Sequence, residues 1–409
     1  PYCELIRQWS TFHPEFAFLP RKFKIAVCGS GEDRAAIHAH DIGIELVPNS
    51  SGETGLKILV GGGLGRTPVI GSVVCEWLDR KHMLTYLDAI LRVYNQHGRR
   101  DNKYKARIKI LVKAMGIDAF RAAVEEEWQS IKDGDSTLTD AAFAHAKSFF
   151  TDRSYESLDG AAQEKALAEE VSADAIFANW VKRNTRLHRI DGYRSVTLSL
   201  KATGHVPGDI SAEQLELVAD LADTYSFGEL RSTHQQNLVL ADVPTSQLKT
   251  LWQQLQGAGL ATPNIGYLTD MICCPGGDYC ALANAKSIPV AEAIQARFAD
   301  LDYLYDIGPL DLNISGCMNA CGHHHIGHIG ILGVDKKGQE FYQVCLGGSQ
   351  AKDASIGKIL GPSFKQDDMP DVIENIIQTY VELRSDEEDF LDTYRRVGID
   401  PFKERVYAQ

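Results

Sequence analysis

Residues 87–94, Leu-Asp-Ala-Ile-Leu-Arg-Val-Tyr, place apolar side chains three and four positions apart, which is the spacing of one buried helix face. The same face recurs 286 residues further along the chain, in residues 373–380, Ile-Glu-Asn-Ile-Ile-Gln-Thr-Tyr. The matched pairs are Leu87 and Ile373, Ile90 and Ile376, Leu91 and Ile377, and Tyr94 and Tyr380. A helix that repeats at so long a period indicates a duplicated structural unit.

Three further blocks occur in the same order in both copies. They are Asp41-Ile42-Gly43-Ile44 with His328-Ile329-Gly330-Ile331, Gly61-Gly62-Gly63 with Leu346-Gly347-Gly348, and Gly116-Ile117-Asp118-Ala119-Phe120 with Gly398-Ile399-Asp400-Pro401-Phe402. Each copy predicts β-strands joined by glycine-rich turns, then an amphipathic helix and a short closing helix. The sequence therefore predicts an α+β fold with a pseudo-two-fold duplication.

Two segments of different composition separate the copies. Residues 121–185 are rich in Ala, Glu, Asp and Lys with helical periodicity, and predict a helical connector. The next segment predicts strands at 195–200 and 228–240 and helices at 212–225 and 246–256, the pattern of a ferredoxin-like half domain. The expected division is a first repeat at 1–120, the connector at 121–185, the half domain at 186–258 and the second repeat at 259–409.

Only the second repeat is preceded by a half domain. By symmetry the first repeat should follow a similar half, yet the chain opens at Pro1, some twenty residues before the first expected strand. We therefore expect that an N-terminal ferredoxin-like half is missing from this chain. A processed or truncated chain explains this better than the loss of the half in evolution.

Bulk composition limits the function classes. The chain has 409 residues, 44% hydrophobic and 24% charged, as expected for a globular protein with more than one core. No apolar run approaches the roughly 18 residues that cross a bilayer, and the N-terminus does not resemble a secretory signal, so we expect a cytoplasmic protein without a membrane partner. The net charge of −13 argues against nucleic-acid binding. Nine cysteines in such a chain are more often thiols or metal ligands than disulfides.

Four of the cysteines form two spaced pairs. Cys274-Pro-Gly-Gly-Asp-Tyr-Cys280 is followed, after 36 residues, by Cys317-Met-Asn-Ala-Cys321. Four thiolates on two tight loops suit a 4Fe–4S cubane, because each iron needs one thiolate beside its three sulfides. The alternative is structural zinc, but zinc sites usually use Cys-x2-Cys turns, which neither pair has. Since Cys273 stands beside Cys274, spacing leaves the first ligand open between them.

This cysteine pattern resembles the sirohaem and 4Fe–4S motif of assimilatory sulfite and nitrite reductases, and the likeness extends along nearly the whole chain. The resemblance implies that Cys274, rather than Cys273, binds the cluster together with Cys280, Cys317 and Cys321. It also implies that Cys321 bridges to the sirohaem iron, so that electrons entering at the cluster reach the iron that binds the substrate.

A second segment supports the resemblance. Leu19-Pro20-Arg21-Lys22-Phe23-Lys24 resembles the family segment whose two lysines face the bound anion. Alternation on a strand would place Lys22 and Lys24 on one face and Phe23 on the other. Taken alone, a lysine pair on an edge strand more often serves solubility, but the resemblance favours an anion site. Because nitrite-specialised relatives tend to have Asn in place of Lys24, the resemblance favours sulfite over nitrite.

Other residues are weaker candidates. The family likeness implies that basic side chains bind the eight sirohaem carboxylates, and that three polar residues of the half domain line the cofactor cavity; strand-end hydrogen bonding is an equal alternative for the latter. The basic candidates are Arg66, Arg99 and Arg100, and the polar ones are Arg231, Gln236 and Asn237. We expect His323, His324, His325 and His328 to contact the cluster or the tetrapyrrole rather than to bind another metal.

The resemblance implies an oxidoreductase that reduces sulfite to sulfide with six electrons, using sirohaem and a 4Fe–4S cluster. The electron donor would be ferredoxin or a separate flavoprotein, since the chain shows no flavin or nicotinamide motif. Reduction of nitrite to ammonia is the second possibility. If the N-terminal half is absent from the working protein, a non-catalytic Fe–S electron carrier or a sirohaem-binding remnant is the third.

Overall fold

The computed structural model describes residues 1–151, 153–386 and 388–408. The chain forms two compact units. The first unit comprises residues 1–152 together with residues 349–356, and the second comprises residues 153–348 and 357–409. Residues 349–356 lie within the second sequence repeat but pack with the first unit.

The first unit contains a four-stranded sheet in the order β1-β2-β3-β4. Strand β1 is parallel to β2, and the remaining pairs are antiparallel. The strands are β1 (Ile25–Cys28), β2 (Ile42–Pro48), β3 (Thr54–Val60) and β4 (Ser72–Asp79). Short 3-10 turns interrupt the loops at Pro14–Phe18, Ile37–Ala39, Arg80–His82 and Lys103–Lys105.

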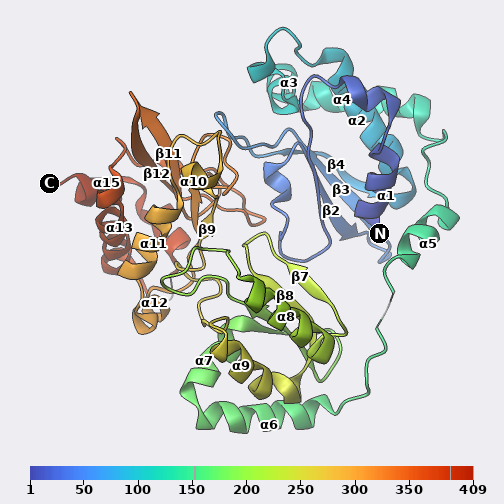
Figure 1. Cartoon of the computed structure of the whole chain (residues 1–409). Helices are drawn as coiled ribbons and strands as arrows, with labels where there is room; N and C mark the ends of the chain where they lie inside the picture. Colours follow the sequence, from blue (N-terminus) through green and yellow to red (C-terminus); the bar gives the residue numbers. More distant parts are fainter. Residues whose placement is uncertain (152, 387, 409) are drawn as a thin grey trace. The chain divides into compact units, whose positions relative to one another are not determined.

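Helices of the first unit cover this sheet. They are α1 (Tyr2–Ser10), α2 (Met83–His97), α3 (Ile108–Met115), α4 (Ile117–Ile131) and α5 (Asp140–Ser148). Helix α2 runs beside α4 (Figure 1) and buries the apolar face that the sequence predicts, including Leu87 and Ile90, both 0% exposed. The Tyr94 hydroxyl, at the end of that face, donates to the carbonyl of Ala106 at 2.7 Å. Burial of this face supplies much of the hydrophobic stabilisation of the unit.

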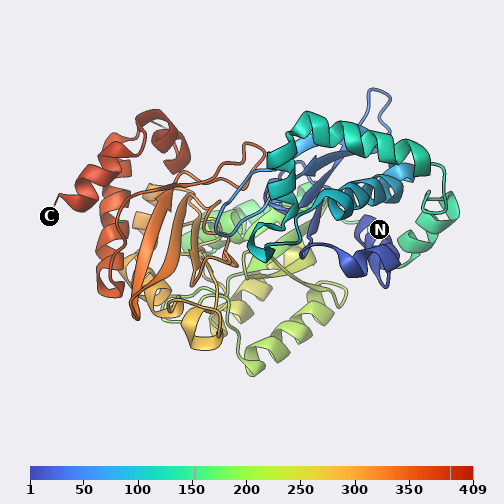
Figure 2. The same ribbon diagram turned by 90° about the horizontal axis from the view of Figure 1, so that it is seen from above.

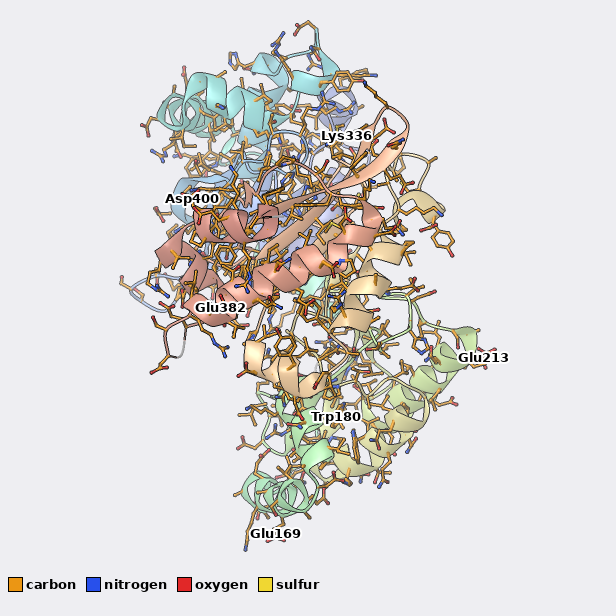
Figure 3. The ribbon with its side chains drawn as sticks, turned by 90° about the vertical axis from the view of Figure 1, so that its left-hand side faces the viewer. Glu169, Trp180, Glu213, Lys336, Glu382 and Asp400 are labelled. Carbon is orange, nitrogen blue, oxygen red and sulfur yellow. The ribbon has the colours of Figure 1, made fainter. Side chains whose placement is uncertain are left out.

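The second repeat has the same plan, with one extra strand, β9, at one edge of the sheet. Its sheet has the order β13-β12-β11-β10-β9. The strands are β9 (Ile272–Cys273), β10 (Leu312–Ser315), β11 (Ile329–Lys336), β12 (Gln339–Leu346) and β13 (Lys358–Ile359). Strands β9, β10 and β11 are parallel, and Lys336 lies at the tip of the antiparallel β11–β12 hairpin (Figure 3).

The helices of the second repeat pack against this sheet, as the orange and red elements of Figure 2 show. They are α10 (Gly276–Tyr279), α11 (Ile288–Arg297), α12 (Leu301–Ile307), α13 (Met369–Leu383), α14 (Phe390–Val397) and α15 (Asp400–Tyr407), with a 3-10 turn at Gln366–Asp368. Helix α13 buries Ile373, Ile376 and Ile377, the counterparts of the buried residues of α2. The predicted α+β fold with a pseudo-two-fold duplication is therefore confirmed.

Backbone contacts of the repeated blocks are also the same in both copies. The parallel pair Ile25 and Ile42 of the first unit corresponds to Leu312 and Ile329 of the second. Gly61 N–H donates to the carbonyl of Asp41 at 3.0 Å, and Gly347 N–H donates to that of His328 at 2.9 Å. Both glycines have φ near +80°, which side chains other than glycine rarely adopt. The duplication thus extends to single backbone contacts.

The half domain forms a separate sheet in the order β5-β6-β8-β7. Its strands are β5 (Thr185–Leu187), β6 (Tyr193–Leu198), β7 (Leu230–Ser232) and β8 (Leu238–Pro244). Helices α8 (Ala212–Tyr225) and α9 (Leu248–Gly257) cover the sheet, with a 3-10 turn at Thr245–Gln247. The single strand predicted at 228–240 was wrong, because the polar residues 233–237 form a tight turn between β7 and β8.

The expected connector is helical but is divided between the units. Helices α4 and α5 belong to the first unit, whereas α6 (Gly160–Ala173) and α7 (Ala175–Asn184) belong to the second. Trp180 of α7, labelled in Figure 3, is fully buried in the core of the half domain. Within the described ranges, no helix combines the length and apolar composition that a membrane span requires.

Candidate iron–sulfur and anion-binding residues

The two cysteine loops leave neighbouring strands at the same end of the sheet. Cys274 directly follows β9, and Cys317 lies two residues beyond the end of β10. Because β9 and β10 are parallel, their carboxyl ends lie side by side. The Cys274 N–H donates to the carbonyl of Ile314 at 3.1 Å, so the pairing of the two strands continues to the first cysteine. The fold therefore brings together two loops that are far apart in the sequence.

Glycines allow the two loops to pack backbone against backbone. A Cβ atom on Gly316 would lie 2.8 Å from the Cα of Gly276, closer than real side chains come. The carbonyl of Gly316 accepts hydrogen bonds from the N–H groups of Asn284 and Ala285 at 2.8 and 3.1 Å. Gly276 itself has φ of +56°. This close contact explains why the loops need glycine at both positions.

Cys273 and Cys274 occupy different environments. The Cys273 side chain is buried in the core, and burial raises the pKa of its thiol. Cys274 is only half-buried. Its Sγ accepts a hydrogen bond from the N–H of Gly316 at 3.0 Å and lies 3.5 Å from Ser287 Oγ. Hydrogen bonds from backbone amides to sulfur are typical of cysteines that bind iron–sulfur clusters.

The remaining three cysteines lie in short turns. Cys280 ends α10, with its N–H donating to the carbonyl of Gly276 at 2.9 Å. Cys317 is buried and Cys321 is exposed. The turn between them is closed by a hydrogen bond from the Ala320 N–H to the carbonyl of Cys317 at 3.2 Å. Local hydrogen bonds thus define the backbone at Cys280 and in the turn that begins at Cys317.

Four cysteines are the donor set of a 4Fe–4S cluster, which takes one thiolate for each iron. Among the residues that the structure describes, no three His, Cys, Asp or Glu side chains gather as the ligands of one metal ion would. The thiolates of a 4Fe–4S cluster surround one cube but stand further apart than the ligands of a single ion, because each binds a different iron.

His324 supplies a further indication of a bound group. Its side chain is 1% exposed, and neither ring nitrogen has a hydrogen-bond partner within the described part of the chain. Burial lowers the pKa of His324 to about 3, so the ring is neutral and carries one donor and one acceptor. Buried polar atoms are nearly always satisfied, so a partner outside the protein chain fits this site. A tetrapyrrole edge or an ordered water has the required chemistry.

The lysine segment belongs to the first unit. Lys22 and Lys24 are both exposed, and the half-buried Phe23 lies 6.0 Å from the ring of Tyr94. The alternation of faces follows the prediction, but the strand does not, since β1 begins only at Ile25. The strand begins only after Lys24 because the N–H of Lys24 donates to the Asp41 carboxylate, at 3.0 Å, instead of to a strand carbonyl.

Asp41 is a site residue that the sequence reasoning missed. Its carboxylate is fully buried and accepts hydrogen bonds from Arg107 through Nε at 2.9 Å and Nη2 at 2.8 Å. Burial raises the pKa of Asp41, while the guanidinium of Arg107 acts in the opposite direction. The Asp41–Arg107 pair thus holds the backbone of Lys24 in place through the hydrogen bond from the Lys24 N–H to Asp41. In the sequence, Asp41 could have been recognised as a candidate because it is an acidic residue within one of the repeated blocks.

The basic candidates Arg99 and Arg100 are engaged in contacts within the protein. Arg99 pairs with Asp101, and Arg100 donates to the carbonyls of Phe18 and Asn95 at 2.7 and 2.9 Å. Arg66 is exposed. Binding of sirohaem carboxylates by these arginines remains a prediction.

Lys109, which follows these arginines in the sequence, is buried beneath the glycine-rich loop that begins at Gly61. Its Nζ donates to the carbonyls of Leu64 and Thr67 at 2.9 and 2.6 Å, which shapes the loop from below. Burial lowers the pKa of Lys109 to about 8. The sequence could have indicated the burial of Lys109 through its position on the apolar face of α3.

The three candidates of the half domain are also engaged in protein contacts. Arg231 is exposed on β7 and pairs with Glu229. Asn237 is buried and donates to the Asp270 carboxylate at 2.8 Å. The Gln236 side chain bonds to the backbone of Cys273. Strand-end hydrogen bonding therefore describes Gln236 and Asn237, and their contact with a cofactor remains a prediction.

Comparison with known families agrees with this geometry. The profile described as the nitrite and sulphite reductase 4Fe-4S domain matches residues 1–132 and 268–409, which include both sequence repeats and all four cysteines. The profile of the nitrite/sulfite reductase ferredoxin-like half domain matches residues 190–258. The chain belongs to the nitrite and sulfite reductase family. Members of this family carry a 4Fe–4S cluster and sirohaem, and the cysteine loops and the buried His324 fit these groups.

Curated relatives include both activities. The chain is 28% identical over 404 residues to sulfite reductase (ferredoxin) 2 of Mycolicibacterium paratuberculosis, and the match covers 95% of this chain and 64% of the relative. It is 29% identical over 376 residues to the ferredoxin–nitrite reductase of Synechococcus elongatus, covering 89% of this chain and 64% of the relative. The chain thus spans less than two thirds of the length of these relatives.

A solved structure supports the fold. The NirA protein of Mycobacterium tuberculosis matches with a TM-score of 0.73 and 26% sequence identity, covering 98% of this chain and 67% of NirA. The agreement extends over both units and the half domain, since nearly the whole chain takes part.

Proposed function

We propose that this chain acts in the reduction of sulfite to sulfide, as part of an enzyme that uses sirohaem and a 4Fe–4S cluster. The observation that carries the proposal is the pair of cysteine loops at the carboxyl ends of β9 and β10. The relatives named as ferredoxin-dependent sulfite reductases support the choice of sulfite and of ferredoxin as the electron donor, ahead of a flavoprotein.

In this proposal, four cysteines would hold the cluster, and Cys321 would also help to hold the sirohaem. The ligands are Cys274, Cys280, Cys317 and Cys321. The bound cofactors supply electron transfer and the iron that binds the substrate. The protein contributes thiolates, a hydrogen bond from Gly316 to the Cys274 sulfur, and the exclusion of water from the buried side of the loops.

Lys22 and Lys24 are proposed to bind the anion. Two ammonium groups attract an oxyanion, stabilise negative charge that builds as S–O bonds break, and donate protons to the departing oxygen. Arg66, Arg99 and Arg100 are proposed to bind the sirohaem carboxylates, for which guanidinium groups are well suited. We also propose that boundaries at residues 120, 185 and 258 separate the first repeat, the connector, the half domain and the second repeat. The proposed location of the protein is the cytoplasm.

Nitrite reduction to ammonia is the second candidate, since relatives such as that of Synechococcus elongatus are named nitrite reductases. Purified chain with both cofactors should show sirohaem absorption bands, and should consume sulfite faster than nitrite when supplied with reduced ferredoxin. A cluster spectrum without tetrapyrrole bands would instead identify an electron carrier. Cys321→Ser should abolish turnover, whereas Cys28→Ser, a buried cysteine outside the motif, should retain it.

A further inference from the structure

Two adjacent cysteines, Cys273 at the end of β9 and Cys274 directly after it, compete for the place of the first cluster ligand. Successive side chains of a strand point to opposite faces, so a shift of register by one residue would exchange the two sulfurs. Strand β9 is only two residues long and lies at the edge of its sheet. Only two residues of β9, Ile272 and Cys273, pair with β10, which is few for fixing the register of the strand.

Gln236 bonds to the outer edge of β9. Its Nε2 donates to the carbonyl of Cys273 at 2.8 Å, and the Cys273 N–H donates to its Oε1 at 2.8 Å. A side-chain amide thus makes the two hydrogen bonds that a peptide group of a further strand would make. A shift by one residue would turn these backbone groups of Cys273 away from Gln236 and break both bonds.

The backbone of Gln236 is itself held in place. It lies in the tight turn between β7 and β8 with φ of +62°, and its N–H donates to the carbonyl of Thr233 at 3.1 Å. Gly208 packs directly behind it, since a Cβ on Gly208 would lie 2.8 Å from the Cβ of Gln236. A residue kept in this uncommon conformation by its surroundings often has a functional reason.

A buried ion pair anchors the chain just before β9. Lys201 Nζ lies 2.8 Å from Asp270 Oδ1, and the two side chains are 0% and 5% exposed. Asn237, the neighbour of Gln236, donates to the same Asp270 oxygen at 2.8 Å. The Gly266 N–H donates to the other oxygen at 2.9 Å. The half domain therefore binds the cluster segment at two points, Asp270 and Cys273.

We propose that Gln236 is a positioning residue that sets the register of β9 and so selects Cys274, rather than Cys273, as the cluster ligand. The inference rests on the proposed function for the identity of the bound cluster. It assigns Gln236 a role through the protein backbone and not through contact with sirohaem.

The first test needs no cofactor. In the full chain before reconstitution, an alkylating reagent followed by mass spectrometry should label half-buried Cys274 well ahead of buried Cys273. Gln236→Leu removes both bonds at nearly constant size and should bring the two labelling rates together. Gln235→Leu, one residue earlier in the same turn, should keep the wild-type ratio because the Gln235 side chain makes no bond to Cys273.

The second test reads the cluster itself. With the cluster bound, Gln236→Leu should lose iron to a chelator about 10- to 100-fold faster than wild type, the range seen when supporting partners of metal ligands are removed. Its electron paramagnetic resonance signal should split into two components, and adding Cys273→Ser should remove the second component. A single wild-type signal with wild-type retention in Gln236→Leu would overturn the inference.

Two controls separate the possible failures. If Gln236→Leu does not fold, Gln236→Glu, which keeps the acceptor for the Cys273 N–H, must show the same change in labelling ratio to a smaller degree; an unchanged ratio overturns the inference. If wild type binds no 4Fe–4S cluster, the proposed function fails, while the labelling test still decides whether Gln236 sets the register.

Discussion

Single polar side chains hold the backbone next to the candidate site in both repeats. The Lys24 N–H donates to Asp41 at 3.0 Å, and at the equivalent position the Asp311 N–H donates to Nδ1 of His328 at 3.2 Å. A carboxylate and an imidazole thus perform the same task in the two copies. Only the carboxylate has a buried cationic partner, Arg107, which makes the first copy more sensitive to substitution.

Asp41→Asn should reduce the stability of the chain strongly. The substitution leaves the mostly buried Arg107 guanidinium without its counter-charge, and breaking such a pair costs about 3 kcal/mol or more. Thermal unfolding followed by circular dichroism would measure the loss. Asp101→Asn removes the exposed partner of Arg99 and should leave the unfolding temperature unchanged. Equal effects of the two substitutions would contradict this account of Asp41.

Lys24→Asn should impair sulfite reduction more than nitrite reduction. The loss of one ammonium group removes charge stabilisation at the proposed anion site, and such losses reduce turnover by about 100-fold. Steady-state rates with each anion would measure the difference. Lys57→Asn, which alters a lysine paired with Glu76 on the same sheet, should affect neither rate. Losses of equal size for both anions would contradict the preference for sulfite.

Whole loops are duplicated along with the strands and helices. The loop after β1 and the loop after β10 have the same length, and both contain a non-glycine residue with positive φ at the same position, Ala36 at +49° and His323 at +56°. Gly71 N–H donates to the carbonyl of His38 at 2.7 Å, and Gly357 N–H to that of His325 at 2.8 Å. The copies therefore share the length of this loop and two of its backbone features, while its chemistry differs.

Gly347→Ala should destabilise the second unit more than Gly338→Ala. Both glycines have φ near +80°, which costs an alanine about 1–2 kcal/mol. An added Cβ on Gly347 would also lie 2.0 Å from Cε1 of Tyr394, whereas one on Gly338 would meet nothing within 4 Å. Overpacking of this kind adds about 1–3 kcal/mol. Urea denaturation of the two variants would show the difference, and similar midpoints would contradict it.

At the scale of the molecule, the chain passes between its two units within the predicted connector. Residues 149–151 and 153–159 form no helix or strand, and Phe149 and Phe150 are 58% and 55% exposed. Shortly afterwards the chain is bound to the half domain, since the Tyr155 hydroxyl donates to Asp242 at 2.8 Å. The exposed Phe149 and Phe150 therefore lie just before a segment that Tyr155 anchors to the half domain.

Brief digestion with chymotrypsin should cut first after Phe149 or Phe150, giving fragments 1–150 and 151–409 on a denaturing gel. Exposed backbone without secondary structure is the preferred site of cleavage, and the hydrogen bond of Tyr155 protects the next aromatic residue. The double substitution Phe149→Ser with Phe150→Ser should delay this cut. A first cut at Tyr155 would contradict the anchoring of that segment.

The duplication, the α+β class and the half domain could be predicted from the sequence because each depends on local periodicity. The buried face of α2 and α13 is one example, since helical spacing of apolar residues is visible in any single chain. The incorrect single strand at 228–240 also came from local periodicity, which does not show where one strand ends and the next begins. Leu230 belongs to β7 and Leu238 to β8, and only the pairing of these two strands reveals the turn between them.

The sequence by itself determined that four cysteines lie on two loops of one repeat, since spacing needs no folded structure to be seen. Only the tertiary structure decided what surrounds them. Gly316 reaches the sulfur of Cys274, and Gln236 binds the backbone of Cys273 from a domain whose sequence lies more than thirty residues earlier. Hydrogen bonds between such distant segments depend on the packing of strands, and packing leaves no local signature in the sequence.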